Sequence, residues 1–538
     1  MKKVMSLALA GVLFLFVGCT KETEVAQKSI LMNTLPVELT TDVAAPYSLP
    51  LEKNEGATLK IAAFENLYGA ASYAENLPVW QEIERRTGVK IEWEVIPSSQ
   101  YAVVMRTRLA ASRDIPDIFC LPDDSMVPQL ASSELLLPLN GYINEYGQHT
   151  KKLYEKFPEA YLLNRDQDGV VYTLSDVYTE GNTVKMYAAL IRKDWLETLG
   201  LSIPETLEEW TETLTAFKNQ DPNGNGMKDE VPLAVSTMIS LAPFASAYGL
   251  HSAYSGFWGV DALGKVQYEV LTNRYRDYIT YLNMLYRNGL LKFFLNDQNG
   301  RNLLVHQNSV GCTGAEMSGI SQNYIKGLIS AGVKAPQVVS ILPPKTPSAD
   351  IVFEERTSIA RRVAVYKNTA NPDMAFKWLD YVWGSEDANV LLNFGIEGVS
   401  YNMVDGKPIL SDWTLNNPNG LDPASAVRSL GAFPSFLNVQ NGEFLKQWSS
   451  EGEIEFAAKA VSNMAKPFPL QVILTNEETQ ILSAYNSDIS SYFEEMQIKF
   501  IMGTEPLSKF DEFVSTLKEM GVEELTKVRQ AQYDRYKK

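Results

Sequence analysis

The loop Asp221–Glu230 carries oxygen-bearing side chains at the spacing of a calcium-binding loop. Carboxylate, amide and main-chain oxygens are the ligands that calcium prefers, and alternate residues of a tight loop point to one centre. Gly226 stands where such a loop turns sharply, whereas Pro232 occupies the place of the bidentate glutamate of an EF-hand. The candidate ligands are Asp221, Asn223, Asn225, Met227 through its carbonyl, Asp229 and, as the closing carboxylate, Glu230. We therefore predict a structural calcium site; the alternative is an ordinary turn rich in Asn and Gly.

A second chemical signal lies at the start of the chain. Two lysines precede an apolar run, Val4–Val17, which is too short to cross a membrane comfortably. This layout is typical of a secretory signal peptide. Its end, Phe16 to Cys19, resembles the lipobox of bacterial lipoproteins, in which the cysteine thiol is diacylated after cleavage. We predict lipidation of Cys19 and a membrane-anchored protein outside the cytoplasm; the alternative is an ordinary signal peptide with an incidental cysteine.

Composition excludes several classes of partner. The chain has 538 residues, a formal net charge of -17 and no cluster of lysine and arginine. Such a surface is repelled by nucleic acid, so we expect no nucleic-acid partner. Beyond Cys19 only Cys120 and Cys312 remain, and both follow short apolar runs. We expect buried thiols on strands, with a disulfide between them as the alternative.

Aromatic and polar residues near the ends of predicted strands are candidates for a ligand cleft. Open parallel sheets bind ligands beyond the carboxyl ends of their strands. A sugar offers apolar C–H faces to aromatic rings and hydroxyls to Asp, Asn and Glu. The candidates are Asn66, Tyr68, Asp123, Tyr178, Glu316 and Tyr401, with Trp258 and Trp413 in loop-like surroundings. Each is an ordinary core or surface residue in the competing interpretation.

The hydrophobic pattern supplies elements to position these residues. Between 58 and 121 the hydrophobic pattern is typical of a strand, a helix, a strand, a helix and a strand in turn. This order predicts a parallel sheet with covering helices. A second such unit begins near Met186, and its helix after Pro204 has Thr206 and Glu209 placed as a capping box. The last stretch, 477–538, is predicted to be mostly helical with breaks at Gly503 and Gly521.

No motif of a known enzyme class is present in the sequence. It contains no HExxH zinc helix, no GxSxG nucleophile elbow and no Walker loop, and its three histidines are scattered. We expect a binding protein rather than an enzyme. An anchored polysaccharide hydrolase or lyase is the alternative, because two carboxylates suffice for glycoside hydrolysis. A second alternative is a receptor for a non-sugar solute such as a peptide.

Taken in order, several segments resemble the extracellular solute-binding proteins of family 1, the lipoprotein receptors of bacterial ABC importers. They are Arg86–Ile91, Leu109–Ile118, Ala189–Leu201, Pro372–Glu386, Ile396–Gly398 and the tail Tyr492–Tyr536. The calcium-like loop also resembles one in the alginate-oligosaccharide receptors of this family, which implies the same six ligands.

The resemblance implies a two-lobed α/β fold of the type II periplasmic-binding-protein class, with the ligand gripped between the lobes. We expect a signal peptide over 1–19, a flexible tether over 20–57, a first lobe over 58–182 and 357–400, and a second over 183–356 and 401–538. Hinges are expected near 179–185, near 356–362 and near Ser400. The implied function is capture of a carbohydrate by a monomeric receptor that delivers it to ABC permease subunits, and we expect this carbohydrate to be an oligosaccharide.

Overall fold

The computed structural model describes residues 40, 42, 46–51, 57–65, 71–178 and 187–538, apart from 253, 296, 298–299, 301, 303–304, 317–319, 347–352, 356, 358, 435 and 462–463. The predicted signal peptide, Cys19 included, lies outside these residues. No helix of the described part is long and apolar enough to cross a membrane.

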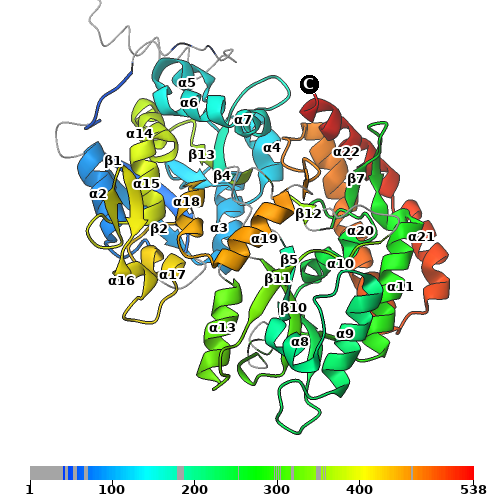
Figure 1. Ribbon diagram of the computed structural model, residues 1–538. Coiled ribbons are helices and arrows are strands. Elements are labelled where there is room, and N and C mark those ends of the chain that lie inside the picture. The colour runs from blue at the N-terminus through cyan, green and yellow to red at the C-terminus, as the bar shows by residue number, and fades with distance from the viewer. Residues whose placement is uncertain are drawn as a thin grey trace, which may run out of the picture.

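Two separate sheets organise the chain (Figure 1). The first has the order β16-β4-β13-β3-β1-β2. Its strands are β1 (Thr58–Phe64), β2 (Lys90–Ile96), β3 (Ile118–Cys120), β4 (Thr173–Tyr178), β13 (Ile359–Val365) and β16 (Val439–Gln440). All run parallel except β13, which is antiparallel to both β3 and β4. The predicted strand–helix alternation from 58 to 121 is confirmed.

The second sheet has the order β11-β5-β10-β6-β9. Its strands are β5 (Tyr187–Arg192), β6 (Val231–Val235), β9 (Leu291–Phe293), β10 (Val310–Glu316) and β11 (Val338–Ile341). Here β5 alone is antiparallel to its neighbours. Each sheet therefore carries one reversed strand, and each reversed strand follows a segment that arrives from the other sheet.

Helices cover both sheets and bury their apolar faces against them. In the first lobe these are α2 (Pro78–Thr87), α3 (Ser98–Ala111), α4 (Val127–Ser132), α5 (Asn140–Tyr146), α6 (Gln148–Lys156), α7 (Pro158–Asn164), α14 (Pro372–Gly384) and α15 (Glu386–Phe394). In the second they are α8 (Lys193–Leu199), α9 (Leu207–Asn219), α11 (Asn273–Arg287), α13 (Ile320–Ser330), α20 (Asn476–Met502), α21 (Phe510–Glu519) and α22 (Val522–Tyr536). The predicted capping box of Thr206 and Glu209 begins α9, and Gly503 and Gly521 interrupt the C-terminal helices as expected.

Two large apolar cores confirm the two-lobed fold. One gathers the first sheet with residues such as Ile61, Phe119 and Trp378, and the other gathers the second sheet with residues such as Trp210 and Phe500. Cys120 and Cys312 are buried free thiols, one in each core, so the buried-thiol prediction is confirmed.

The segment 401–445 departs from the expected lobe boundary. Tyr401, Val427 and Leu445 all pack in the first core, not in the second. This segment includes the hairpin of β14 (Tyr401–Val404) and β15 (Lys407–Leu410), and the helices α16 (Asp412–Leu415), α17 (Pro423–Arg428) and α18 (Gly442–Lys446). The chain next contributes to the second core at Phe468. The third crossing therefore lies after Leu445 rather than near Ser400, which is itself buried.

The crossing segments meet between the lobes. β12 (Phe353–Glu354) pairs in parallel with β17 (Met464–Ala465), which follows α19 (Glu451–Val461). Part of the predicted tether also rests on the first lobe: the Tyr47 hydroxyl donates to Asp380 at 2.8 Å, and the Leu51 amide donates to the Thr87 carbonyl at 2.8 Å. The described end of that segment is thus packed, not free.

Candidate ligand cleft and calcium loop

The topology turns the carboxyl edges of the two sheets toward each other. β4 ends at Tyr178 in the first sheet, and the chain next enters the second sheet as the reversed strand β5. Because β5 is antiparallel to its neighbours, it begins at the edge where β6, β10 and β11 end. The return from β11 to the reversed strand β13 has the same geometry. Ligands bind beyond such edges in open α/β sheets.

Two of the predicted ligand residues lie at the carboxyl edge of the first sheet. Asp123 follows β3, and Tyr178 is the last residue of β4. The Asp123 carboxylate accepts hydrogen bonds from the Ser125 amide at 2.9 Å and from the Ser125 hydroxyl at 2.7 Å, and it pairs with Arg106 at 3.1 Å. These contacts hold a partly exposed carboxylate in one orientation. That either residue contacts a ligand remains a prediction.

Arg361 joins this edge, although sequence reasoning did not select it. It stands at an irregularity of β13, where the register shifts between Ala360 and Arg362, and its φ of 31° lies in the left-handed region. Strained backbone of this kind costs free energy and clusters at functional sites. The available signal was a pair of adjacent arginines inside an otherwise apolar strand.

Asp176 holds the Arg361 guanidinium in place. Its Oδ2 accepts from Arg361 Nε at 2.7 Å and from Nη2 at 2.5 Å, while its Oδ1 accepts from the Asn438 amide at 2.9 Å. Burial by itself lowers the pKa of Arg361, but the attraction of Asp176 outweighs it and leaves that pKa raised. The guanidinium lies 5.9 Å from the ring centre of Phe64, and about a third of the Arg361 side chain stays exposed. This leaves a fixed donor group at the end of β1.

A polar pocket of about 510 Å³ lies beside this edge and takes its walls from both lobes. This volume is within the range of small-molecule sites. The first lobe contributes Asp123, Asp124, Ser125 and Arg362; the segment 470–474 forms one side; and Thr479, Leu482, Ser483, Asn486, Ser487 and Arg529 come from α20 and α22.

Several polar atoms of this pocket have no hydrogen-bond partner. They are Thr479 Oγ1, Arg362 Nε and Arg529 Nε, all three of them buried. Buried polar atoms without a partner are costly and mark places where water or a ligand supplies the missing bond. The Arg362 side chain is otherwise well held: it pairs with Asp124 and donates to the Leu163 carbonyl at 2.9 Å.

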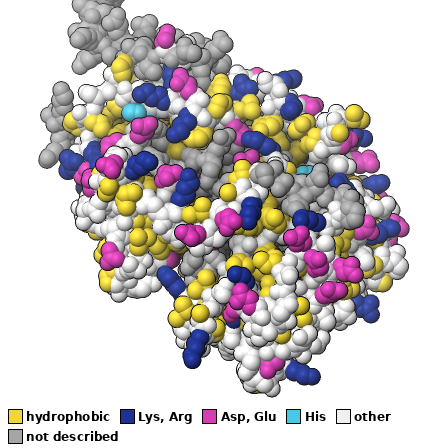
Figure 2. Space-filling model, viewed as in Figure 1, with side chains coloured by type: hydrophobic (Ala, Val, Ile, Leu, Met, Phe, Trp, Pro, Cys, Tyr) yellow, Lys and Arg dark blue, Asp and Glu magenta, His cyan; other side chains and the backbone are white. Residues whose placement is uncertain are grey.

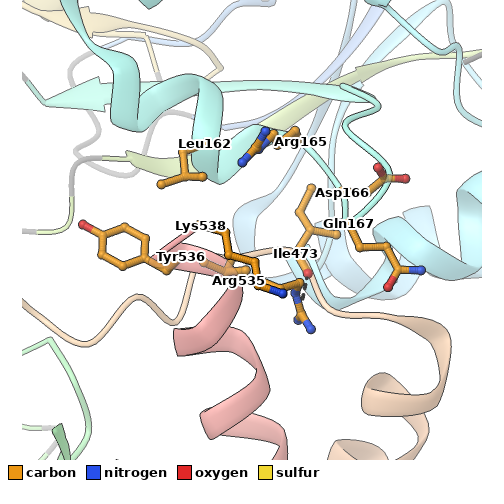
Figure 3. A pocket seen from close by; sticks show the side chains of 9 residues that line it. Leu162, Arg165, Asp166, Gln167, Ile473, Arg535, Tyr536 and Lys538 are labelled. Carbon is orange, nitrogen blue, oxygen red and sulfur yellow. Dashed lines mark hydrogen bonds between the residues drawn. The ribbon is translucent and has the colours of Figure 1, made fainter. Parts of the chain in front are cut away.

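A smaller cavity of about 120 Å³ shares Val472 and Ile473 with this pocket. Figure 3 shows Arg535, Tyr536 and Lys538 at the end of α22 facing Leu162 and Arg165 across it. Its volume is below that of ordinary ligand pockets, so we regard it as interface packing.

Two of the predicted ligand residues are core residues in the structure. Trp258 lies in β7 (Trp258–Val260), not in a loop, and packs at 4.7 Å between ring centres on Tyr268 of β8 (Val266–Tyr268). Tyr401 is buried against Phe394. Burial raises the pKa of its hydroxyl, and the nearby positive charge of Arg86 offsets part of that rise. Arg86 is in the last turn of α2, which precedes β2, so Tyr401 lies at the opposite end of the sheet from the cleft edge. Neither offers an exposed surface to a ligand.

The structure describes the surroundings of the remaining predicted ligand residues only in part. Trp413 is half-buried in α16 of the first lobe, and Glu316 ends β10 at the carboxyl edge of the second sheet, with its side chain outside the described part. Asn66 and Tyr68 also lie outside the described residues. Their roles remain predictions.

The loop Asp221–Glu230 is closed by its own Asx contacts. Asp221 accepts from the Asn225 amide at 3.1 Å and from the Gly226 amide at 2.9 Å. Gly226 has a φ of 75°, as the predicted sharp turn requires, and a Cβ would be strained there. The side-chain amides of Asn223 and Asn225 donate to Asp229 at 3.3 Å and 3.1 Å. Two of the candidate ligands, Asn223 and Asn225, thus contact a third, Asp229.

One observation besides the spacing of the ligands supports a cation in this loop. The Glu230 carboxyl has a buried oxygen, Oε1, without a partner, and its pKa is raised, first by burial and then by the nearby carboxylates of Asp229 and Asp221. A bound cation favours the ionised form of a carboxyl group whose pKa neighbouring carboxylates raise. Among the described residues no three His, Cys, Asp or Glu side chains form a metal cluster by themselves, so the amide and carbonyl oxygens would have to contribute.

The loop lies away from the cleft. It precedes β6, and the Val231 amide donates to the Ser309 carbonyl at 2.7 Å just before β10 begins. Asn308 accepts from Asn223 at 3.2 Å through its carbonyl and from Arg192 at 2.6 Å through its side chain. These contacts tie the starts of β6 and β10 to the end of β5, which is the edge opposite to the ligand side. A cation here would act on stability.

Comparisons with known proteins agree with this architecture. The sequence pattern of the family described as bacterial extracellular solute-binding protein matches residues 70–389, more than half of the chain. The chain is 22% identical over 511 residues to the fructooligosaccharide ABC transporter substrate-binding protein FusA of Streptococcus pneumoniae serotype 4 (strain ATCC BAA-334 / TIGR4), with 91% of this chain and 92% of that protein covered.

Two solved structures share the fold. The alginate-binding protein AlgQ2 without calcium ion superposes with a TM-score of 0.74 at 24% identity, covering 91% of this chain and 100% of that one. A FusA EF-hand mutant from S. pneumoniae in complex with fructo-nystose gives a TM-score of 0.73 at 20% identity, covering 89% and 99%. These relatives are binding proteins rather than enzymes.

Proposed function

This chain belongs to the bacterial extracellular solute-binding protein family, and from that premise we propose that it captures an oligosaccharide between its two lobes and delivers it to an ABC permease. The single observation that carries the proposal is the pocket of about 510 Å³ with walls from both lobes, because a solute bound there contacts both halves at once. Contacts to both lobes shift the population toward the closed form.

The chemistry around this pocket suits a sugar. Hydroxyl and amide side chains on α20 stand beside apolar residues of the segment 470–474, and Asp123 and Arg362 face them from the first lobe. Hydroxyls of a sugar both donate and accept, which matches such a mixed set of partners. The names of the relatives, a fructooligosaccharide receptor and an alginate receptor, support a carbohydrate of several units.

We further propose that calcium binds Asp221, Asn223, Asn225, the Met227 carbonyl, Asp229 and Glu230. When bound, the ion neutralises the carboxylates that otherwise raise the pKa of Glu230. The AlgQ2 structure is named as a form without calcium ion, and the FusA structure is named as an EF-hand mutant. Both names support a metal-binding loop in this fold. The role is structural, because the loop lies at the edge opposite to the cleft.

Anchorage completes the proposal. A lipid on Cys19 would hold the mature monomer at the outer face of the cytoplasmic membrane, and the segment that leads from it lies on the first lobe at Tyr47 and Leu51. The closed receptor would then meet the permease at the same membrane.

Calorimetric titration against a panel of oligosaccharides, combined with small-angle scattering, tests the proposal. We expect saturable binding, a smaller radius of gyration on binding and recovery of the sugar unchanged. Asn486→Ala removes a hydrogen-bonding side chain that lines the pocket and should weaken binding by up to about tenfold, with Asn416→Ala, at an exposed position, as the matched control. Release of reducing ends would instead support the hydrolase, and a particle that no solute compacts would contradict the receptor.

A further inference from the structure

We propose that the pocket between the lobes recognises an acidic oligosaccharide, whose carboxylate pairs with Arg529 of α22. This inference rests on the proposed function, since it concerns the same bound sugar, and it adds a charge requirement that is argued from the residues of this pocket. It follows from how the charged groups of the pocket are paired with one another.

Arg529 is held rigidly but carries no counter-charge. Its Nη1 donates to the Gln532 side chain at 2.6 Å, and its guanidinium lies 5.9 Å from the ring centre of the buried Trp258. Its Nε has no hydrogen-bond partner, and no described carboxylate forms an ion pair with it. Trp258, which the sequence suggested as a sugar platform, is thus a positioning residue that supports this guanidinium.

The other charges of the pocket are already balanced. Asp123 pairs with Arg106 at 3.1 Å, and Asp124 pairs with Arg362. Glu478, the carboxylate that acts on Arg529 from a distance, is itself held in a two-bond pair by Arg535 at 2.6 Å. Arg529 is therefore a positive charge without an ion-pair partner among the described residues, in a pocket whose other charged side chains are paired.

This charge persists at neutral pH. Burial lowers the pKa of Arg529 to about 10, which still leaves the guanidinium protonated. A partly buried cation without a counter-ion is costly, and the cost is removed when an anion binds. The molecule as a whole carries a net charge of -17, so its surface repels anions and a local cation is needed to accept one.

The shape of the free donors selects a carboxylate. The Nε–Nη2 edge of Arg529 makes no hydrogen bond to any described residue, and this edge matches the two oxygens of a carboxylate. Thr479 Oγ1 is a buried hydroxyl without a partner in the same pocket, and Ser483 and Asn486 stand on the next turns of α20. Leu482 offers an apolar contact for the C–H face of the ring. Together they describe a uronic acid unit.

Titration calorimetry with a short oligogalacturonide and with its methyl ester tests the inference, because esterification removes the charge and leaves the sugar skeleton. The full-length protein should bind the acid about tenfold to a hundredfold more tightly than the ester. Arg529→Gln should abolish this difference, Arg529→Lys should restore part of it, and Arg165→Gln, which removes the same charge from the neighbouring cavity, should leave it intact. Unchanged melting temperatures establish that the variants are folded.

The outcomes separate the two proposals. Equal binding of acid and ester, discrimination that survives Arg529→Gln, or binding of neutral oligosaccharides alone would overturn the acidic ligand while the receptor function stands. Preference for a sulfated oligosaccharide over the uronide would overturn the carboxylate. Failure to bind any oligosaccharide would overturn both proposals.

Discussion

At the scale of single residues, the candidate calcium loop is the feature whose chemistry is most completely specified. Asp221 and Asp229 are the centres of its hydrogen-bond network, and each accepts from groups that lie four to six residues away in the loop. Removing both carboxylates removes the charge that would attract a cation and the acceptors that close the loop.

We expect the double variant Asp221→Asn, Asp229→Asn to lose its calcium dependence of melting. In the unmodified protein, calcium at a hundred times its dissociation constant stabilises by about 2.7 kcal/mol, which raises the melting temperature by several degrees. Differential scanning calorimetry, run with calcium and with chelator, measures the melting temperatures of the unmodified protein and of the double variant. The pair Glu512→Gln, Glu519→Gln removes two exposed charges from α21 and should leave the response unchanged. Identical melting with and without chelator in the unmodified protein would remove the calcium site.

Glu230 makes this response depend on pH. Its pKa in the calcium-free fold is raised above the ordinary 4.5, so the folded protein holds this proton more tightly than the unfolded chain does. The stability of the calcium-free protein therefore falls as pH rises through the raised pKa. Calcium needs the ionised carboxylate. We expect the calcium-induced rise in melting temperature to be full near neutral pH and to fade on acidification before pH 4.5 is reached; a rise that stays constant down to pH 4 would contradict it.

At the scale of elements, close packing inside the second lobe explains a glycine in the middle of a strand. β10 passes the short helix Met238–Leu241 so closely that a Cβ on Gly314 would lie 1.8 Å from the Ser240 carbonyl oxygen. The Ser240 carbonyl oxygen belongs to the backbone and cannot rotate away. The strand that carries Glu316 to the cleft edge therefore depends on this glycine.

Gly314→Ala should destabilise the protein by about 1–3 kcal/mol, the usual cost of overpacking. Gly452→Ala is the matched control, because Gly452 lies in α19 with open space around its Cβ position. Alanine favours a helix over glycine, so the control should stabilise by about 0.5–1 kcal/mol. Chemical denaturation compares the two, and equal effects would refute the packing argument.

At the scale of the whole molecule, each lobe has its own core, and each core contains one buried cysteine that can report on the opening of its lobe. Cys120 lies in the first core and Cys312 in the second. Burial raises the pKa of Cys120 to about 12 and raises that of Cys312 well above its ordinary 9. Neither thiol reacts readily until its lobe opens.

Calcium removal should open the second lobe selectively. The metal loop contacts the start of β10, and Cys312 stands two residues beyond Val310 in that strand. With chains lacking residues 1–19 and carrying Cys120→Ala or Cys312→Ala, we expect chelator to speed thiol labelling of Cys312 severalfold and to leave Cys120 unaffected. Equal acceleration of both thiols would show that the loop stabilises the molecule as one unit instead.

What the sequence determined by itself is local or periodic. The loop spacing with Gly226, the capping box of Thr206 and Glu209, and the strand–helix alternation all involve residues a few positions apart, so their physics is contained in a short window. These patterns were enough to predict two α/β units and a candidate metal loop, whereas the arrangement of the units as two lobes around a ligand was implied by the resemblance to a family.

What only the tertiary structure decided depends on contacts between distant parts of the chain. Arg361 meets Asp176 across 185 residues of sequence, and Arg529 meets Trp258 across 271, and no periodicity encodes such a meeting. Tyr401 and Trp258 have the composition of cleft residues, yet packing buries them, because an aromatic ring gains as much free energy in a core as against a sugar. The position of the third crossing after Leu445 was likewise set by which core offered apolar contacts to residues 401–445.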